Sequence, residues 1–233
     1  MDSPIILALD GKTPDESIAL TDKLRKYIWG VKVNDLFFEM GWEIVELLGA
    51  ATNVMLDVKL FDIPNTVGNI CARFAPRPVD IVTVHATGGE AMIRQAVHHM
   101  AGKVAAVTCL TSFDEESCQA SYGRSSECVV TDLTKIAKAG GASYSVCSPK
   151  ELKLACFKKD YLWAFQGKKI VPGIRPDWFQ TQKPDDQKRT MTPAEAMAAG
   201  ADMLVMGRPI LQHPDPEQAV CMTLEEIEAA QTS

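Results

Sequence analysis

The sequence lacks an excess of positive charge, a long hydrophobic run and any closely spaced pair of cysteines. Its formal net charge is −6, whereas a nucleic-acid-binding surface needs a clustered excess of Lys and Arg. No apolar run approaches the roughly 20 residues of a membrane-spanning helix. We therefore expect no nucleic-acid partner and no membrane partner, and an anionic ligand would need a local basic pocket.

The cysteines are odd in number and scattered, and no CxxC motif occurs. The seven are Cys71, Cys109, Cys118, Cys128, Cys147, Cys156 and Cys221. Most lie in apolar neighbourhoods, as small core residues do, which argues against a disulfide framework or a zinc site. The N-terminal segment starts with acidic Asp2 and lacks the basic region of a signal peptide. These features predict a soluble, cytoplasmic protein with reduced thiols.

The sequence does have the ordinary composition of a globular protein, with 46% hydrophobic and 23% charged residues. Its 233 residues suit a single α/β barrel, which typically has about 250 residues. Because no linker, repeat or low-complexity tract divides the chain, we expect one domain over residues 1–233. The longest irregular stretch is RPDWFQTQKPDDQKRTMT at 175–192, and a loop of this length is usually a lid or binding loop, or mobile.

Eight short β-like runs alternate with helix-like segments along the chain. The runs are Ile5–Leu9, Gly30–Val33, Val54–Leu60, Ile81–His85, Val104–Leu110, Tyr144–Cys147, Lys169–Pro172 and Met203–Met206. The helical segments are Pro14–Tyr27, Met40–Leu48, Asn65–Phe74, Glu90–Met100, Glu127–Ala139, Pro149–Phe157, Pro193–Ala199 and Pro216–Ala230. Thr13 is expected to cap the first helix, with Pro14 in its first turn. The alternation predicts an α/β fold, a closed (β/α)8 TIM barrel, with an open doubly wound sheet as the alternative.

The predicted strands carry polar residues at their carboxyl ends, where a barrel has its active site. These residues are Asp10, Lys32, Asp57, Lys59, His85, Thr111, Gly173, Arg175, Gly207 and Arg208. Any one of them alone could be a helix cap or a core residue with satisfied hydrogen bonds. Their concentration at one end of the predicted barrel indicates a functional site. We interpret His85 as structural rather than as an acid or base.

Three charges interrupt the strand-like stretch LDVKLFDIPNT at 56–66. Asp57 and Lys59 are two residues apart, so on a strand they share one face, and in a barrel that face is the interior. Lys32 on the neighbouring strand could share it, while Asp62 lies past the strand end, before Pro64. An Asp–Lys pair alone could be a structural ion-pair network. Two aspartates flanking one lysine beside a second buried lysine favour a poised ammonium group.

The segments after the last two predicted strands suggest a phosphate site. In such barrels phosphate is often held by the loops after strands seven and eight. VPGIRP contains Gly173, which allows close backbone approach, and VMGRPI places Gly207 next to Arg208. The planar guanidinium of an arginine can bind phosphate through two hydrogen bonds. We expect the phosphate to bind here, with the loop at about 176–191 closing over it.

Several motifs in order carry a resemblance to a known family. They are LALD at 7–10, VKV at 31–33, LDVKLFDIPNT at 56–66, VHATGG at 84–89, LTS at 110–112, PGIRP at 172–176, DDQKRTMTP at 185–193 and GADMLVMGRPI at 200–210. In these motifs the chain resembles the orotidine 5′-phosphate decarboxylase family, in its bacterial, monofunctional form. Asp-x-Lys-x-x-Asp alone is less specific, because related sugar-phosphate decarboxylases share it.

The resemblance implies decarboxylation of orotidine 5′-phosphate to UMP and CO2, the last step of UMP biosynthesis, without a metal or cofactor. It implies Lys59 as the proton donor to C6 of the pyrimidine, and Asp57 beside the substrate carboxylate. The implied catalytic residues are Lys59, Asp57, Asp62 and Lys32. The implied substrate-binding residues are Asp10, Lys32, Asp57, Asp62, Ile63, Thr66, Thr111, Pro172, Arg175, Gln187, Gly207 and Arg208.

The resemblance also implies how these residues divide the substrate among them. Asp10 and Lys32 would hold the ribose hydroxyls, and Thr111 would contact the pyrimidine edge. The phosphate end would be lined by Arg175, Gln187, Gly207 and Arg208, with Gln180 and Gln182 as alternatives to Gln187. The family forms homodimers, in which Asp62 and Thr66 would reach the partner's site.

Two alternative functions remain open from the residues. One is a related lyase or aldolase acting on a sugar phosphate, which would need a phosphate site but no pyrimidine contact. The other is a catalytically silent protein that binds a nucleotide phosphate. The intact set of Asp57, Lys59 and Asp62 argues against the second.

Overall fold

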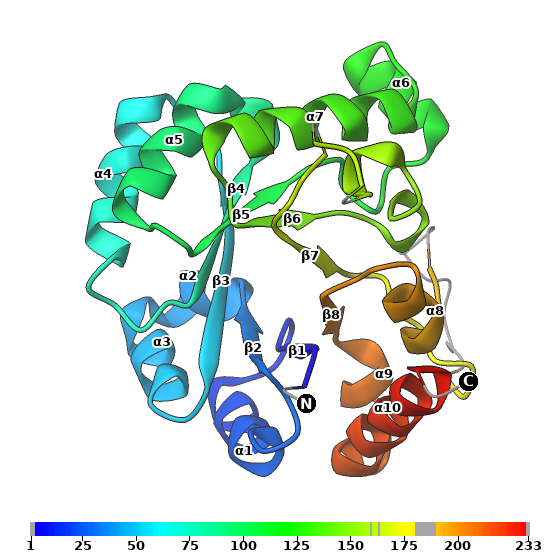
Figure 1. Ribbon diagram of the computed structural model, residues 1–233. Coiled ribbons are helices and arrows are strands. Elements are labelled where there is room, and N and C mark those ends of the chain that lie inside the picture. The colour runs from blue at the N-terminus through cyan, green and yellow to red at the C-terminus, as the bar shows by residue number, and fades with distance from the viewer. Residues whose placement is uncertain (1–2, 159, 163, 180–189, 232–233) are drawn as a thin grey trace.

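Eight parallel β-strands close into a barrel in the computed structural model of the chain (Figure 1). The structure describes residues 3–158, 160–162, 164–179 and 190–231. The strands are β1 (Ile5–Ala8), β2 (Gly30–Val33), β3 (Asn53–Leu60), β4 (Ile81–His85), β5 (Val104–Val107), β6 (Tyr144–Val146), β7 (Lys168–Val171) and β8 (Met203–Met206). Each pairs with the next in sequence, and β8 pairs with β1. This closure confirms the predicted (β/α)8 barrel and excludes the open doubly wound sheet.

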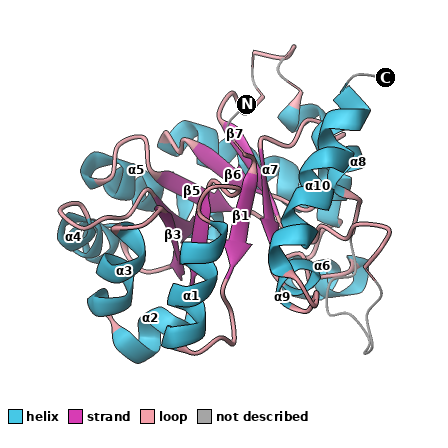
Figure 2. Ribbon diagram, turned by 90° about the horizontal axis from the view of Figure 1, so that it is seen from below, coloured by secondary structure: helices cyan, strands magenta, loops and turns pink. Residues whose placement is uncertain are grey.

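Helices surround the strands on the outside (Figure 2). They are α1 (Pro14–Leu24), α2 (Asp35–Met40), α3 (Trp42–Gly49), α4 (Pro64–Phe74), α5 (Gly89–His99), α6 (Glu115–Tyr122), α7 (Ser126–Gly140), α8 (Pro193–Ala198), α9 (Arg208–Leu211) and α10 (Pro216–Gln231). Within the described ranges, short 3-10 turns lie at Ala86–Gly88, Pro149–Glu151 and Ala155–Phe157. Neighbouring helices pack against one another, for example α4 against α5 and α5 against α7.

Two hydrophobic layers hold the barrel together, one on each side of the sheet. Along β1 the side chains of Ile5 and Leu7 belong to the layer between the strands and the helices. Their neighbours Ile6 and Ala8 belong to a separate cluster inside the barrel. This alternation follows from the two-residue repeat of a strand, and fully buried side chains of this size contribute about 1.5–3 kcal/mol each. Ala8 also borders the cavity at the mouth of the barrel, so the inner cluster forms part of its floor.

The predicted helix over Met40–Leu48 is wrong in its bounds, because two helices, α2 and α3, occupy this region. Gly41 separates them with a φ of 61°, a left-handed conformation that glycine adopts without a Cβ clash. The sequence pattern did not predict α2, because this helix is short and Leu36 is its one buried residue.

The predicted helix over Pro149–Phe157 is also wrong. The segment forms two separate 3-10 turns, and Leu154 between them has an extended backbone with ψ of 144°. The break turns Cys156 and Phe157 into the core, where both are buried. Tertiary packing here overrides the local helical spacing of apolar residues.

The sequence pattern missed α6 and α9, and it extended β5 too far, to Leu110. α6 is polar and buries only Cys118, so it has no apolar stripe to detect. Its end signals were present in the sequence, since Asp114 caps its first turn and Gly123 follows its last residue. β5 ends at Val107, so Thr111 lies in the following turn rather than at the strand end.

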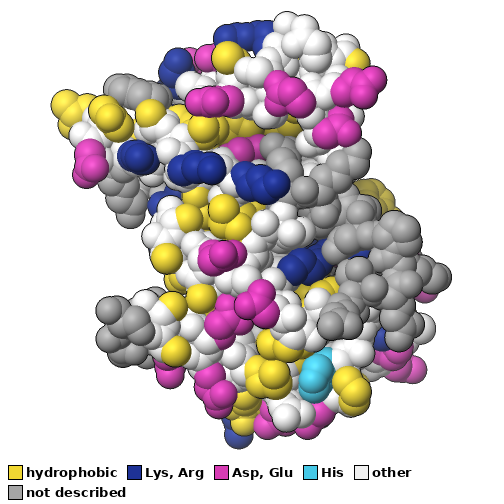
Figure 3. All heavy atoms as spheres, turned by 90° about the vertical axis from the view of Figure 1, so that its right-hand side faces the viewer, with side chains coloured by type: hydrophobic (Ala, Val, Ile, Leu, Met, Phe, Trp, Pro, Cys, Tyr) yellow, Lys and Arg dark blue, Asp and Glu magenta, His cyan; other side chains and the backbone are white. Residues whose placement is uncertain are grey.

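Among the described residues, no helix combines the length and the apolar character of a membrane span. On the face drawn in Figure 3, basic and acidic side chains are interspersed with apolar and uncharged ones. That face shows no broad surface of one charge among the residues it colours.

The predicted cap of the first helix is confirmed and can be tested. Thr13 Oγ1 accepts a hydrogen bond from the backbone N–H of Glu16 at 3.3 Å, and the Glu16 carboxylate accepts one from the N–H of Thr13 at 2.9 Å. Thr13→Ala should lower the free energy of unfolding by about 1 kcal/mol. That loss corresponds to a fall in Tm of about 2–4 °C for a domain of this size. Thr13→Ser keeps the acceptor oxygen and should melt like the wild type in a calorimetric scan. Equal melting of the Ala and wild-type proteins would contradict the capping role.

Candidate active site

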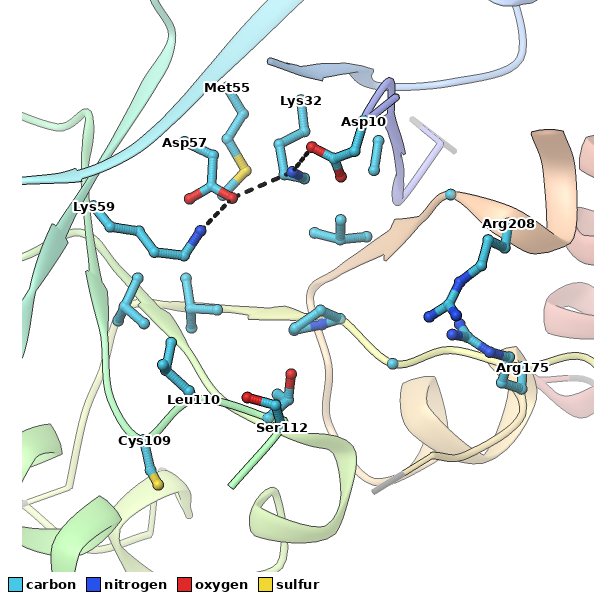
Figure 4. Close-up of a pocket in the computed structure, with 18 of the residues that line it drawn as sticks. Asp10, Lys32, Met55, Asp57, Lys59, Cys109, Leu110, Ser112, Arg175 and Arg208 are labelled. Carbon is cyan, nitrogen blue, oxygen red and sulfur yellow. Dashed lines mark hydrogen bonds and ion pairs between the residues drawn. The ribbon is translucent and has the colours of Figure 1, made fainter. Parts of the chain in front are cut away.

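A cavity of about 660 Å³ opens at the carboxyl ends of the strands (Figure 4). Most of the residues predicted for the site line it. These are Asp10, Lys32, Asp57, Lys59, Thr111, Pro172, Gly173, Arg175, Gly207 and Arg208. They come from β2, β3 and the segments after β1, β5, β7 and β8, so only the closed barrel brings them into one cavity.

Four charged side chains form a continuous array on one wall of the cavity (Figure 4). Lys32 Nζ lies 2.8 Å from Asp10 Oδ1 and 3.3 Å from Asp57 Oδ2. Lys59 Nζ lies 2.8 Å from the same Asp57 Oδ2. The Asp57 side chain is only 7% exposed, that of Lys32 10% and that of Lys59 35%. Signs alternate along the array, so each buried charge has an opposite charge beside it.

The array keeps its two most buried members ionised. Burial alone would raise the pKa of Asp57, but the ammonium groups of Lys32 and Lys59 outweigh it and hold this pKa below its usual range. Burial acts on Lys32 in the opposite sense and lowers its pKa, but the carboxylates of Asp57 and Asp10 raise that pKa above its usual range. At neutral pH Asp57 is therefore a carboxylate and Lys32 an ammonium.

Lys59 reaches the array through a bulge in β3. Leu56 pairs with Val82 and Leu60 with Val84 on β4, so β3 has two residues more than its partner between these pairs. Lys59 has a φ of 45° and is the one non-glycine residue in the described part of the chain with a positive φ. Such a conformation is costly for a residue with a Cβ, and it concentrates at functional sites. Asp57 and Lys59 do meet, as predicted, but a bulge rather than regular strand alternation brings them together.

Two polar residues that the sequence pattern did not single out support this bulge. Asn34 Nδ2 donates a hydrogen bond to the backbone carbonyl of Asp57 at 2.6 Å. Thr83 on β4 contacts both the backbone N–H of Lys59 and the carboxylate of Asp57. These contacts could not be read from the sequence, because each joins residues more than 20 positions apart in the chain.

Two arginines lie together at the other side of the cavity from Lys59 and Asp57 (Figure 4). Arg175 follows β7, and Arg208 is the first residue of α9, which is separated from β8 by Gly207 alone. Gly173 beside them has a φ of 78°, which suits glycine and leaves the backbone open to a ligand. The guanidinium of Arg175 also lies 5.8 Å from the centre of the Phe179 ring, a cation–π contact. This part of the cavity can bind a phosphate.

Three predicted site residues do not line the cavity of their own chain. Asp62 and Ile63 are exposed and Thr66 is half-buried, and all three lie at or beyond the end of β3. Gln187, with its alternatives Gln180 and Gln182, lies outside the described residues, as does most of the predicted loop 176–191.

His85 ends β4 and is half-buried, outside the cavity lining. Burial and the nearby charge of Lys59 lower its pKa, while the Asp57 carboxylate acts in the opposite sense. It is therefore neutral at pH 7.

The cavity also has a lining that sequence reasoning missed. Its additional members are Ala8, Met55, Val107, Cys109, Leu110, Ser112, Val146, Val205 and Leu211. Strand alternation could have found some of them, since Met55 precedes Asp57 by two positions and Val205 precedes Gly207 by two. A mostly apolar wall beside a few charged groups is typical of a small-molecule site. The described residues contain no group of three or more His, Cys, Asp or Glu placed to hold a metal ion.

Comparisons with known proteins agree with this geometry. The model of the orotidine 5′-phosphate decarboxylase / HUMPS family matches residues 3–222. The chain is 38% identical over 241 residues to the orotidine 5′-phosphate decarboxylase of Dictyoglomus turgidum, which covers 97% of this chain and 95% of the relative. It is 39% identical over 236 residues to that of Sphingopyxis alaskensis, covering 98% of this chain and 99% of the relative.

A solved structure supports the same assignment. The orotidine 5′-phosphate decarboxylase from Lactobacillus acidophilus superposes with a TM-score of 0.80 at 31% identity, covering 97% of this chain and 99% of that one. Sequence, length and fold therefore agree over almost the whole chain. The chain belongs to the orotidine 5′-phosphate decarboxylase / HUMPS family.

Proposed function

We propose that this protein decarboxylates orotidine 5′-phosphate to UMP and CO2, the last step of UMP biosynthesis, without a metal or organic cofactor. The observation that carries the proposal is the placement of two charge systems in one cavity. The Asp10–Lys32–Asp57–Lys59 array forms one wall, and Arg175 and Arg208 lie at the other side. The relatives reported above carry the name of this activity.

The chemistry explains why an ammonium group is needed. Loss of CO2 from C6 leaves an electron pair in an sp2 orbital that the pyrimidine ring cannot delocalise. Without a cofactor the enzyme has to stabilise this pair by a fixed positive charge and then protonate the carbon. Lys59 supplies both, because its Nζ is held by Asp57 at 2.8 Å and projects into the cavity.

Asp57 orients Lys59 and lies beside the position of the substrate carboxylate. Repulsion between two carboxylates is relieved when neutral CO2 forms, but two charges 4 Å apart interact by only ~4 kcal/mol at an effective dielectric of about 20. Enzymes commonly lower barriers by ~8–23 kcal/mol. Stabilisation of the carbanion by the preorganised array is therefore the larger effect.

The remaining predicted residues bind the rest of the nucleotide. Asp10 and Lys32 hold the ribose hydroxyls, and Thr111 contacts the pyrimidine edge, with Ser112 beside it in the lining. Pro172, Arg175, Gly207 and Arg208 surround the phosphate, together with Gln187. Binding energy from the phosphate holds the ring in register with Lys59.

We also propose a homodimer in which Asp62 and Thr66 complete the partner's site and Ile63 lies at the interface. Two apolar side chains on either side of Asp62, Phe61 and Ile63, are 64% and 66% exposed. Phe38 of α2 and Leu47 of α3 are also exposed, at 72% and 49%. Contiguous exposed apolar surface marks interaction sites, and Phe61 and Ile63 flank Asp62 in the sequence. A cytoplasmic location is supported by the cysteines, none of which forms a disulfide bond in the part of the chain that the structure describes.

The proposed function is tested directly by turnover of orotidine 5′-phosphate. The absorbance of the pyrimidine should change at a catalytic rate, with release of one CO2 per UMP, and EDTA should leave the rate unchanged. Turnover of a sugar phosphate instead, or loss of activity in EDTA, would favour the related lyases. Tight UMP binding with no turnover would indicate a silent nucleotide-binding protein.

Lys59→Ala removes the proton donor and the charge that faces the carbanion. We expect kcat to fall by at least about 1,000-fold, since each of these contributions is commonly worth 100-fold or more. UMP should bind the variant with a Kd within about tenfold of the wild type, because the arginines that hold the phosphate remain. Lys26→Ala, an exposed lysine beyond α1, is the matched control and should keep full activity. Near-normal turnover by Lys59→Ala would rule out the assigned role.

The shared site predicts recovery of activity when two inactive variants are mixed. A hybrid of Asp57→Asn and Asp62→Ala subunits has one site with both changes and one with neither. Mixing and re-equilibrating the two inactive homodimers should therefore restore about a quarter of wild-type activity in a two-fold symmetric dimer. Mixing Asp57→Asn with Lys59→Ala is the control and should restore none, because these residues belong to the same chain's site. No recovery in the first mixture, with hybrids verified by mass spectrometry, would refute the exchange of Asp62.

A further inference from the structure

The hydroxyl of Thr83, on β4, contacts both central residues of the charged array at once. Its Oγ1 accepts a hydrogen bond from the backbone N–H of Lys59 at 2.9 Å and donates one to Asp57 Oδ1 at 2.9 Å. The side chain is fully buried and is not part of the cavity lining. Thr83 can therefore influence a substrate only through Asp57 and Lys59.

The direction of these hydrogen bonds is determined by the chemistry of the partners. A backbone N–H can only donate and an ionised carboxylate can only accept, so the single hydroxyl hydrogen of Thr83 points to Asp57. The other carboxylate oxygen, Oδ2, faces Lys32 Nζ and Lys59 Nζ. With both oxygens engaged, the carboxylate plane of Asp57 is held in one orientation.

The second contact concerns the bulge that delivers Lys59. The backbone N–H of Lys59 lies where β3 and β4 are out of register, so no regular ladder bond is available to it. The Thr83 hydroxyl satisfies this N–H instead. On the other side of β3, Asn34 holds the carbonyl of Asp57. The bulge that contains Lys59 is thus held from β4 and from Asn34, the residue that follows β2.

We propose that Thr83 is a positioning residue for the decarboxylation, whose hydroxyl sets the orientation of the Asp57 carboxylate and holds the backbone bulge of Lys59. The inference rests on the proposed function. It assigns Thr83 no contact with the substrate and no transfer of a proton. It explains a fully buried polar side chain between two apolar ones, Val82 and Val84.

The test is the exchange of the hydroxyl for a methyl group in Thr83→Val, which keeps the size and branching of the side chain. Loss of a hydrogen bond to a charged group should lower kcat by about 10- to 100-fold. KM should change by less than about threefold, because the phosphate-binding residues are untouched. Thr83→Ser keeps the hydroxyl and should retain kcat within about threefold of the wild type.

A matched control separates positioning from stability. Thr223 on α10 is also fully buried, and its hydroxyl donates to the carbonyl of Ala219 at 2.8 Å. Thr223→Val loses a buried hydroxyl far along the chain from the array and should keep the wild-type kcat. If Thr83→Val does not fold, Thr83→Ala supplies the same loss of the hydroxyl in a smaller side chain. The inference would be overturned if the folded Thr83→Val or Thr83→Ala protein had the wild-type kcat. It would also be overturned if Thr223→Val lost as much kcat as Thr83→Val, or if Thr83→Ser had a kcat as low as that of Thr83→Val.

The pH profile supplies a readout that a purely structural role would not change. The ionisable groups around Asp57 are Lys32 from β2, Lys59 from β3, His85 from the end of β4 and Asp10, which pairs with Lys32. All of them remain in the variant. Removing a hydrogen bond to the ionised carboxylate raises the pKa of Asp57. Activity that needs the carboxylate should then be lost at a higher pH, so the acid limb of kcat moves upward in Thr83→Val and not in Thr223→Val.

Failure of the inference is distinguishable from failure of the proposed function. A wild-type chain without orotidine 5′-phosphate turnover would overturn the function. In that case the pKa of Asp57, measured by NMR titration of its carboxyl carbon in the wild type and in both Val variants, decides the inference. A raised pKa in Thr83→Val alone supports the positioning of Asp57, and unchanged values overturn it.

Discussion

The site depends on the ion pairs that the carboxylate of Asp57 makes with two lysines. One of its oxygens is shared by two ammonium groups, Lys32 at 3.3 Å and Lys59 at 2.8 Å. Removing one partner from such a buried group leaves an uncompensated charge, which is strongly destabilising. Asp57 therefore has a structural role as well as a chemical one. It keeps two like charges together at the mouth of the barrel, where the proposed reaction needs one of them to face a developing carbanion.

The barrel explains how such an array can be both buried and reactive. The inner hydrophobic cluster, which includes Ile6 and Met55, fills the barrel interior and excludes water from one side of the charges. The carboxyl ends of the strands leave the other side open to the cavity. Closure of the sheet by β1 and β8 places the Gly207–Arg208 segment beside the strand that leads to Asp10. Both ends of a nucleotide can then be held by rigid elements of one cavity.

Hydrogen bonds to a strained backbone bulge hold Lys59 in place. The residue lies in a bulge with a left-handed backbone, a conformation that persists only where surrounding contacts impose it. Thr83 on β4 and Asn34, the residue that follows β2, provide those contacts. The strained backbone conformation therefore lies at Lys59, the residue whose position matters most for the proposed protonation. By contrast, Asp62 is exposed and lies outside the cavity lining of its own chain.

The sequence by itself determined the strand count, the barrel class, most of the polar residues at the strand ends and the cap at Thr13, because these follow from local periodicity and side-chain chemistry. At Pro149–Phe157 the helical spacing of apolar residues predicted a helix that does not form, because packing of Phe157 into the core overrides the pattern. Only the tertiary structure decided the bulge at Lys59, the hydrogen bonds of Thr83 and Asn34, and the apolar lining of the cavity. These depend on the register between neighbouring strands and on closure of the sheet. Strand register and sheet closure are determined by contacts between residues far apart in the sequence. Such contacts leave no periodic pattern within a single segment.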